Sequence, residues 1–265
     1  MCATCGCSSD THPAKAGQVT HPAQAGQVTH EHAHGHDHPA GAGQGKTIID
    51  VEQDILHQNN LLAERNRGYF EAKNILALNL VSSPGSGKTS LLERTLKDLK
   101  DQLEFAVIEG DQRTTRDADR IHATGTKVTQ INTGKGCHLD AHMVLHAVQG
   151  MKPKANSVLF IENVGNLVCP SMFDLGEAER VVIISVTEGD DKPLKYPDMF
   201  ATSTLCIINK TDLLPYVPFS VEDCRNYIHQ VKPGMPIIEL SCTSGQGLEQ
   251  WYDWLKSKVL VAEET

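Results

Sequence analysis

Eight residues, Ser82-Ser83-Pro84-Gly85-Ser86-Gly87-Lys88-Thr89, have the types and spacing that bind a phosphate chain. The backbone N–H groups of such a turn surround the phosphates, and the helix that follows adds the positive end of its dipole. Lys88 then reaches the β- and γ-phosphates while the Thr89 hydroxyl binds Mg²⁺. Ser82 stands where the motif usually has its first glycine. The residues expected to contact the nucleotide here are Gly85, Ser86, Gly87, Lys88, Thr89 and Ser90.

A chance glycine-rich turn is the alternative interpretation of these residues. The apolar run over 75–81 and the helical pattern from Ser90 favour the phosphate-binding loop, because the loop requires a strand before it and a helix after it.

A second motif predicts which base is bound. Asn209-Lys210-Thr211-Asp212 follows an apolar segment and resembles the guanine-reading motif Asn-Lys-x-Asp. A carboxylate at the base edge accepts from guanine N1–H and N2, donors that adenine lacks, so such pairing discriminates strongly. One strand-helix unit later, Ser241-Cys242-Thr243-Ser244-Gly245 resembles the last base-contacting loop of GTPases. We therefore expect GTP or GDP to be held by Asn209, Lys210, Asp212, Ser241 and Cys242.

Two acidic residues, Asp111 and Glu162, end neighbouring strands and are expected to bind Mg²⁺ with Thr89. For Asp111 the alternative is an ordinary cap of a strand end. Gly165 follows Glu162 at the spacing of a γ-phosphate sensor, so Lys88, Asp111 and Gly165 are the catalytic candidates. Asn166 stands where a water-positioning glutamine is expected, which predicts slow hydrolysis.

Thiols and an imidazole accompany this site. Cys137 and His138 share a glycine-rich loop, and Cys169 lies four residues beyond Gly165. These ligand types form a metal site, which symmetry-related copies of the chain can complete. Burial of Cys137 and packing of His138 at a helix start are the alternatives. Cys206 and Cys224 are expected to be core or lining residues. His142 and His146 are expected to lie at the surface, with a role as extra metal ligands as the alternative.

The first 46 residues are expected to be a metal-binding tail that is disordered without metal. Cys2, Cys5 and Cys7 are clustered, a nine-residue repeat follows, and histidines alternate along 30–38. Clustered thiols and imidazoles bind borderline metals, and the segment has too few apolar residues to form a core. A redox pair is the alternative for the cysteines, and a solvated tract or a purification tag for the histidines.

The composition and charge argue against several classes of protein. The 265 residues carry a formal net charge of −9, which argues against nucleic-acid binding. No apolar run approaches the length of a membrane span, and the first residues lack a signal core. The sequence predicts a cytoplasmic protein whose cysteines are thiols or metal ligands.

Strand and helix patterns alternate from residue 75 onward. This alternation predicts an α/β fold, a P-loop NTPase domain over 75–265 with a mostly parallel central sheet and helices on both faces. A helical arm over 47–74 precedes it, either packed on the domain or contacting a partner, and the tail covers 1–46. The strands are expected at 75–81, 105–109, 127–132, 157–162, 181–186, 204–209 and 237–240. The helices are expected near 88–100, 116–123, 138–149, 221–231 and 247–258.

Taken together, these motifs resemble the HypB family, the nickel-insertion GTPases of hydrogenase maturation. The resemblance rests on residues 82–89, 162–170, 187–193 and 209–212, and on the N-terminal Cys2-x-x-Cys5-Gly6-Cys7. It implies a Ni²⁺ or Zn²⁺ site at Cys137, His138 and Cys169, and a nickel site at Cys2, Cys5 and Cys7. It also implies a GTP-dependent homodimer, a HypA-type partner and a [NiFe]-hydrogenase large subunit as recipient.

Other functions remain open at this level. A nickel-storage protein with a regulatory nucleotide site is one alternative, and a urease-type or cobalt-handling GTPase is another. Leu213 and Val217 are expected either at a dimer face or in the core. Lys192 or Lys195 is expected to reach a nucleotide in trans or to be solvated.

Overall fold

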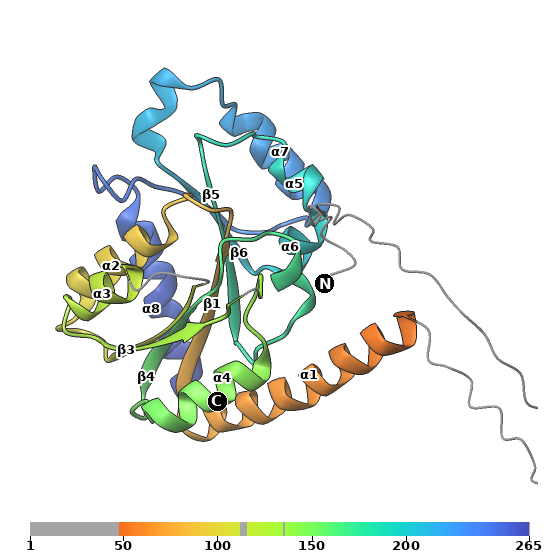
Figure 1. The fold of residues 1–265 in the computed structure, drawn as a ribbon. Helices are drawn as coiled ribbons and strands as arrows, with labels where there is room; N and C mark the ends of the chain where they lie inside the picture. The colour runs from red at the N-terminus through yellow and green to blue at the C-terminus, as the bar shows by residue number, and fades with distance from the viewer. Residues whose placement is uncertain (1–47, 112–115, 135, 265) are drawn as a thin grey trace, which may run out of the picture. The chain divides into compact units, whose positions relative to one another are not determined.

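A parallel seven-stranded sheet, in the order β3-β2-β4-β1-β5-β6-β7, is the centre of the fold (Figure 1). The computed structural model describes residues 48–111, 116–134 and 136–264, and the fold lies in one unit that begins at Glu52. The strands are β1 (Ile75–Ser82), β2 (Phe105–Asp111), β3 (Lys127–Asn132), β4 (Ser157–Glu162), β5 (Glu179–Ser185), β6 (Leu205–Asn209) and β7 (Ile237–Glu239).

Helices follow most strands. They are α1 (Ile48–Ala72), α2 (Lys88–Leu99), α3 (Arg116–His122), α4 (Ala141–Met151), α5 (Lys192–Lys195), α6 (Pro197–Thr202), α7 (Val221–Val231) and α8 (Leu248–Glu264), with short 3₁₀ helices η1 (Cys169–Met172) and η2 (Thr211–Tyr216). None of the helices in the described part of the chain is long and apolar enough to cross a membrane.

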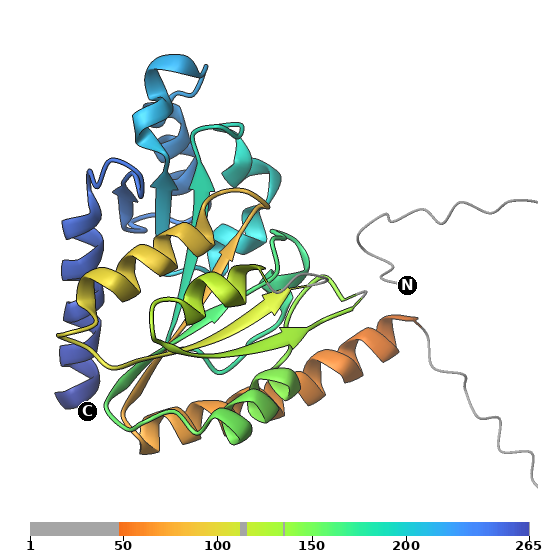
Figure 2. The same ribbon diagram turned by 60° about the vertical axis from the view of Figure 1, so that its left-hand side comes forward.

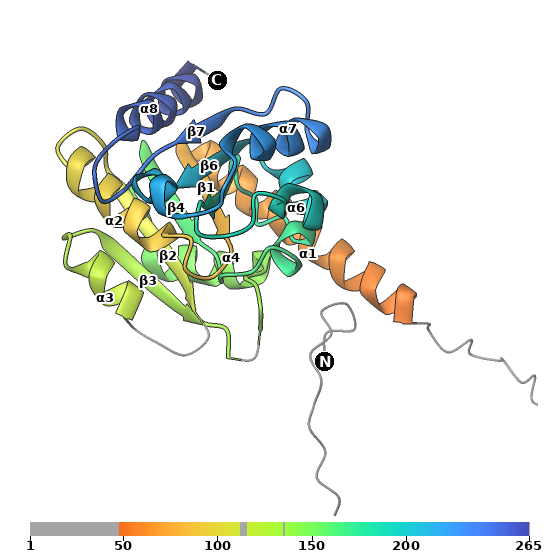
Figure 3. The ribbon, with the colours of Figure 1, turned by 90° about the horizontal axis from the view of Figure 1, so that it is seen from above.

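The helices cover both faces of the sheet, which explains the apolar runs of the central strands. Every residue of β1, β4, β5 and β6 is buried. Leu78 of β1 packs in one core cluster with α2 and α8, whereas Ala77 packs in another with α1 and α4. Figures 2 and 3 show α8 and α1 on opposite sides of the sheet. A third cluster joins β5 and β6 to α6 and α7.

The expected fold class is confirmed. Helix α8, expected to end near 258, continues to Glu264, and a second correction concerns the helix predicted over 138–149. This helix begins at Ala141, because the Asp140 side chain caps it by accepting from Met143 N at 2.8 Å. His138 therefore lies in the preceding loop and not in the helix. The short helices η1, α5, α6 and η2 were not expected from the sequence, since each is too short to show a period.

Helix α1 is tied to two elements that lie beside the metal-ligand candidates. Nδ2 of Asn66 donates to the carbonyl oxygens of Ala141 at 2.9 Å and Leu175 at 3.0 Å. Gly176 has a φ of +88°, and a Cβ there would lie 2.5 Å from the carbonyl oxygen of Ala63. Glycine is thus required where the loop meets α1.

Asn66→Ala is expected to lower the free energy of unfolding by about 2 kcal/mol, because two buried hydrogen bonds are lost at about 1 kcal/mol each. Urea unfolding followed by circular dichroism measures the change. Asn60→Ala is the matched control, since Asn60 is exposed on the same helix and gains the same helix propensity. Equal effects of the two substitutions would contradict this account of how α1 is anchored.

Candidate functional site

The phosphate-loop candidate connects β1 to α2 at the C-terminal edge of the sheet. Gly85 and Gly87 have φ values of +77° and +92°, which favour glycine. A Cβ on Gly87 would also lie 2.4 Å from Nδ2 of Asn209, so the base motif packs directly on this turn. The α2 dipole begins at Lys88, with Thr89 next in the helix and Ser90 after it.

The base-reading candidates lie together at the ends of β6 and β7, next to the phosphate loop. Asn209 Nδ2 donates to the carbonyl oxygen of Ser86 at 2.9 Å, and Lys210 Nζ donates to that of Gly85 at 2.7 Å. Ser241 Oγ donates to Asp212 Oδ1 at 2.5 Å, which orients this carboxylate. The three predicted motifs are thus brought together by the fold.

Cys242 belongs to the same base loop. Its N–H donates to Asn209 Oδ1 at 3.4 Å, and burial raises the pKa of its thiol to about 11. A neutral thiol of this kind lines the site and is a poor metal ligand.

The Glu162 carboxylate lies at the start of α2. Thr89 Oγ1 donates to Glu162 Oε1 at 2.5 Å, and Lys88 Nζ lies 3.4 Å from the same oxygen. Oε2 of Glu162 is buried and has no hydrogen-bond partner in the described part of the chain. A hydroxyl and carboxylate oxygens are the hard ligands that Mg²⁺ prefers, so these residues fit the ion.

Glu109 is a buried acid at this edge that sequence reasoning missed. It lies opposite Glu162 in the pairing of β2 with β4, and its Oε2 also lacks a hydrogen-bond partner among the described residues. Burial and the Glu162 charge raise the pKa of Glu109 to about 8. Without a bound cation, this shift favours the protonated, uncharged form of Glu109 at neutral pH.

Gly165 packs on the phosphate loop, whereas Asp111 ends β2, which is separated from β1 by β4. Asp111 ends β2 half-buried, and its carbonyl oxygen accepts from Thr133 N at 3.0 Å. A Cβ on Gly165 would lie 3.1 Å from Pro84 Cα, so this glycine packs against the phosphate loop. Residues 112–115, next to Asp111, lie outside the described chain.

The metal-ligand candidates converge in a second site. Cys137 Sγ lies 2.8 Å from Cys169 Sγ and 3.7 Å from His138 Nδ1, and the three ligand atoms all lie within 4.8 Å of one another. Cys169 is buried at the start of η1, while the other two are half-buried in the loop before α4. Three such ligands leave a fourth position of a tetrahedral site for another group.

The environment of His138 suits a metal ligand. Its ring stacks on Phe173 with centroids 3.9 Å apart and planes at 27°. Burial lowers the pKa of His138, although the nearby Asp140 charge opposes this shift. The imidazole is thus kept neutral, and a neutral ring has the lone pair that a metal needs.

Two asparagines hold the Cys137 loop against the segment that carries Cys169. Oδ1 of the buried Asn163 accepts from Leu139 N at 3.1 Å, and Asn166 Nδ2 donates to the carbonyl oxygen of Cys137 at 3.3 Å. Both asparagines belong to the short stretch between Glu162 and Cys169. The segment that follows Glu162 is therefore hydrogen-bonded to the loop that carries Cys137 and His138.

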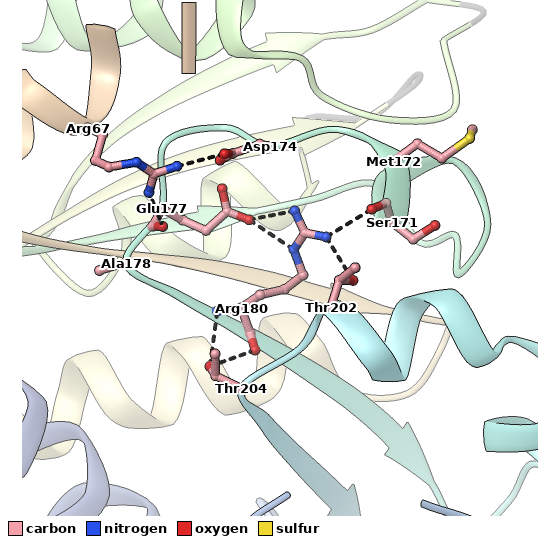
Figure 4. A pocket seen from close by; sticks show the side chains of 9 residues that line it. All are labelled: Arg67, Ser171, Met172, Asp174, Glu177, Ala178, Arg180, Thr202 and Thr204. Carbon is pink, nitrogen blue, oxygen red and sulfur yellow. Dashed lines mark hydrogen bonds and ion pairs between the residues drawn. The ribbon is translucent and has the colours of Figure 1, made fainter. Parts of the chain in front are cut away.

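A buried arginine holds the segment that follows Cys169 in place (Figure 4). Arg180 donates to the carbonyl oxygens of Ser171 at 3.1 Å and Phe173 at 2.9 Å, and pairs with Glu177 at 2.8 Å. Burial opposes ionisation of Glu177, but the Arg180 charge and the Asn79 amide outweigh it and lower the pKa. The network borders a cavity of about 290 Å³ and supports the residue that stacks on His138.

Lys192 also reaches the phosphate loop, within its own chain. Its Nζ lies 3.3 Å from Ser83 Oγ and 3.3 Å from Glu188 Oε2, while Glu188 Oε1 accepts from Ser86 Oγ at 2.7 Å. Lys195 pairs instead with Asp191 at the surface.

The remaining predicted residues fall into two groups. The third core cluster includes Cys206 and Cys224, and Leu213 and Val217 pack against it. For all four residues this agrees with the core role that was one of the two expectations. Cys2, Cys5, Cys7 and the histidine tract lie outside the described residues.

The chain matches the family described as CobW/HypB/UreG, nucleotide-binding domain, over residues 76–239. The hydrogenase maturation factor HypB of Rhizobium leguminosarum bv. viciae is 59% identical over 209 residues, 79% of this chain and 70% of that protein. The factor of the same name from Escherichia coli K12 is 57% identical over 213 residues, 80% and 73% of the two chains. The crystal structure of HypB from Helicobacter pylori in complex with nickel is similar with a TM-score of 0.72, at 41% identity, covering 76% of this chain and 95% of that one.

Asp212→Asn is expected to lower GDP affinity at least about 100-fold, because the amide cannot accept both guanine donors. Xanthosine diphosphate, which presents an acceptor in place of the 2-amine, should then bind more tightly than GDP. Fluorescence titration with labelled nucleotides measures both affinities. Unchanged GDP binding by this variant would show that Asp212 does not read the base.

Ser241→Ala tests how Asp212 is oriented. Losing the hydrogen bond of 2.5 Å to Asp212 should weaken GDP binding about fivefold, near 1 kcal/mol. Thr243→Ala is the matched control, since Thr243 is exposed in the same loop, and it should bind GDP as the parent chain does.

Proposed function

Because the chain belongs to the HypB family of hydrogenase maturation factors, within the CobW/HypB/UreG nucleotide-binding proteins, we propose that it hydrolyses GTP to deliver nickel to a [NiFe]-hydrogenase large subunit. One observation carries this proposal. The segment that bears Glu162 at the nucleotide site also bears Cys169 at the metal site, and its asparagines bond to the Cys137 loop. Binding at one site therefore acts on the ligands of the other.

The nucleotide half of the proposal uses residues at the start of α2. Lys88 contacts the β- and γ-phosphates, and Thr89 with Glu162 and Asp111 holds Mg²⁺. The ion neutralises charge on the phosphates when it is bound. Gly165 donates its N–H to the γ-phosphate. Hydrolysis is slow, since Asn166 replaces the glutamine that orients water in many GTPases.

The metal half of the proposal assigns nickel, or zinc in its place, to Cys137, His138 and Cys169. Thiolate sulfur and imidazole nitrogen suit both ions. Three ligands from one chain leave coordination positions to a donor, a recipient or a second copy of the chain. This incomplete set favours transfer of the ion over permanent storage.

The two halves are coupled through residues 162–169. Gly165 packs on Pro84, so a γ-phosphate that draws the Gly165 N–H toward it moves the residues that follow. Cys169 then shifts relative to Cys137 and His138, and metal affinity changes. Hydrolysis removes the γ-phosphate contact and restores the first arrangement.

The partners and the tail complete the proposal. Cys2, Cys5 and Cys7 bind nickel, which a HypA-type chaperone exchanges with the chain. GTP drives formation of a homodimer, and the released nickel enters the hydrogenase large subunit. The site requires reduced thiols, which favours the cytoplasm as the compartment.

Lys88→Ala is expected to slow GTP hydrolysis at least about 100-fold, the effect of losing one donor to transition-state charge. In a strain that lacks its own factor of this type, the variant should fail to restore hydrogenase activity. Its nickel stoichiometry, measured by equilibrium dialysis of the full chain, should be unchanged. Single-turnover hydrolysis and hydrogenase assays give the two readouts.

Cys169→Ser should also abolish hydrogenase maturation, but with nucleotide binding intact. The proposal would be contradicted if Lys88→Ala and Cys169→Ser both kept hydrogenase activity and only removal of residues 1–46 abolished it. That pattern would make nickel storage by the tail the function.

A further inference from the structure

Two histidines on the exposed face of α4 lie outside the site described above. His142 and His146 are both exposed, their Nε2 atoms are 3.0 Å apart, and their ring planes cross at 84°. Residues four apart share one face of a helix, and two histidines at this spacing bind zinc in metalloproteases. We propose that His142 and His146 form a second, bidentate site for a divalent transition-metal ion.

The distance between the two nitrogens indicates which ions suit the pair. Two metal–nitrogen bonds of about 2.1 Å span 3.0 Å when the angle between them is about 90°. A tetrahedral ion would need the nitrogens about 3.4 Å apart for bonds of that length. An angle near 90° is the one between neighbouring ligands of square-planar and octahedral ions, and rotation of the two exposed rings brings the nitrogens to the tetrahedral separation. The pair therefore suits Ni²⁺, Cu²⁺ or Zn²⁺, ions that imidazole binds.

The helix holds the two rings in place before any ion binds. Asp140 caps the first turn, and Val144 and Val148, on the opposite face, are buried in the core cluster that includes β1 and β4. The backbone positions of His142 and His146 are therefore fixed by packing. Without metal, one ring donates its Nε2–H to the other; when that ring takes the Nδ1–H tautomer, both Nε2 lone pairs can face an ion.

This pair is separate from the group formed by Cys137, His138 and Cys169. It supplies two ligands and no thiol, so it binds more weakly and exchanges its ion more readily. The inference does not rest on the proposed function, because it requires neither GTP hydrolysis nor nickel transfer. It assigns a metal-binding role to α4 itself.

Residue-resolved footprinting of the full chain tests the site. Diethyl pyrocarbonate acylates neutral imidazole nitrogen, and a nitrogen bound to metal does not react. Ni²⁺, added as the chloride in excess of the other sites, should slow modification of His142 and His146 at least about fivefold. The single exposed histidines His57, His122 and His229 are internal controls and should react at unchanged rates.

Two variants separate the possible causes of protection. In His142→Gln, Ni²⁺ should no longer protect His146, because one imidazole cannot chelate. In Cys137→Ser/Cys169→Ser, protection of both histidines should persist, which distinguishes this site from the proposed nickel site. Equal rates with and without Ni²⁺ in the parent chain, or protection of His146 that survives His142→Gln, would overturn the proposal.

Discussion

The hydrogen bonds at the C-terminal end of β4 are the constraint on which both sites depend. Glu162 accepts from Thr89 at the start of α2, and the next residue, Asn163, accepts from Leu139 in the loop before α4. Both side chains are buried, so neither can exchange these partners for water without cost. β4 lies beside β1, so its end is within reach of the loop that follows β1. The loop that follows β3 reaches it across the end of β2, where Leu139 lies against Gly110.

Two different kinds of metal ligand lie at the two ends of this segment. Hydroxyl and carboxylate oxygens collect around Lys88 and suit Mg²⁺, whereas thiols and a neutral imidazole collect around Cys169 and suit a borderline ion. Burial raises the pKa of Glu109 and lowers the pKa of His138, so without a bound cation both groups favour their uncharged forms. The charges of Arg180 and Glu177 cancel, so this pair supports the segment that follows Cys169 without adding net charge.

The sequence predicted the parallel fold because its central strands are continuous apolar runs, and the motifs at their ends marked the sites. It missed Glu109, which reads as an ordinary strand residue until β2 pairs with β4. It also missed the roles of Asn163, Phe173 and Arg180. Their partners are distant in the chain, and short-range spacing carries no signal of such contacts. The late start of α4 was readable in principle from Asp140 as a cap.

The central claim is that nucleotide and metal share one segment, and affinity for a non-hydrolysable GTP analogue tests it most directly. Measured on the full chain with and without Ni²⁺, this affinity should change about 5- to 150-fold, the range of a coupling free energy of 1–3 kcal/mol. The same titration of Cys169→Ser should show no change. An affinity independent of Ni²⁺ in the parent chain, or an equal change in the variant, would contradict the account.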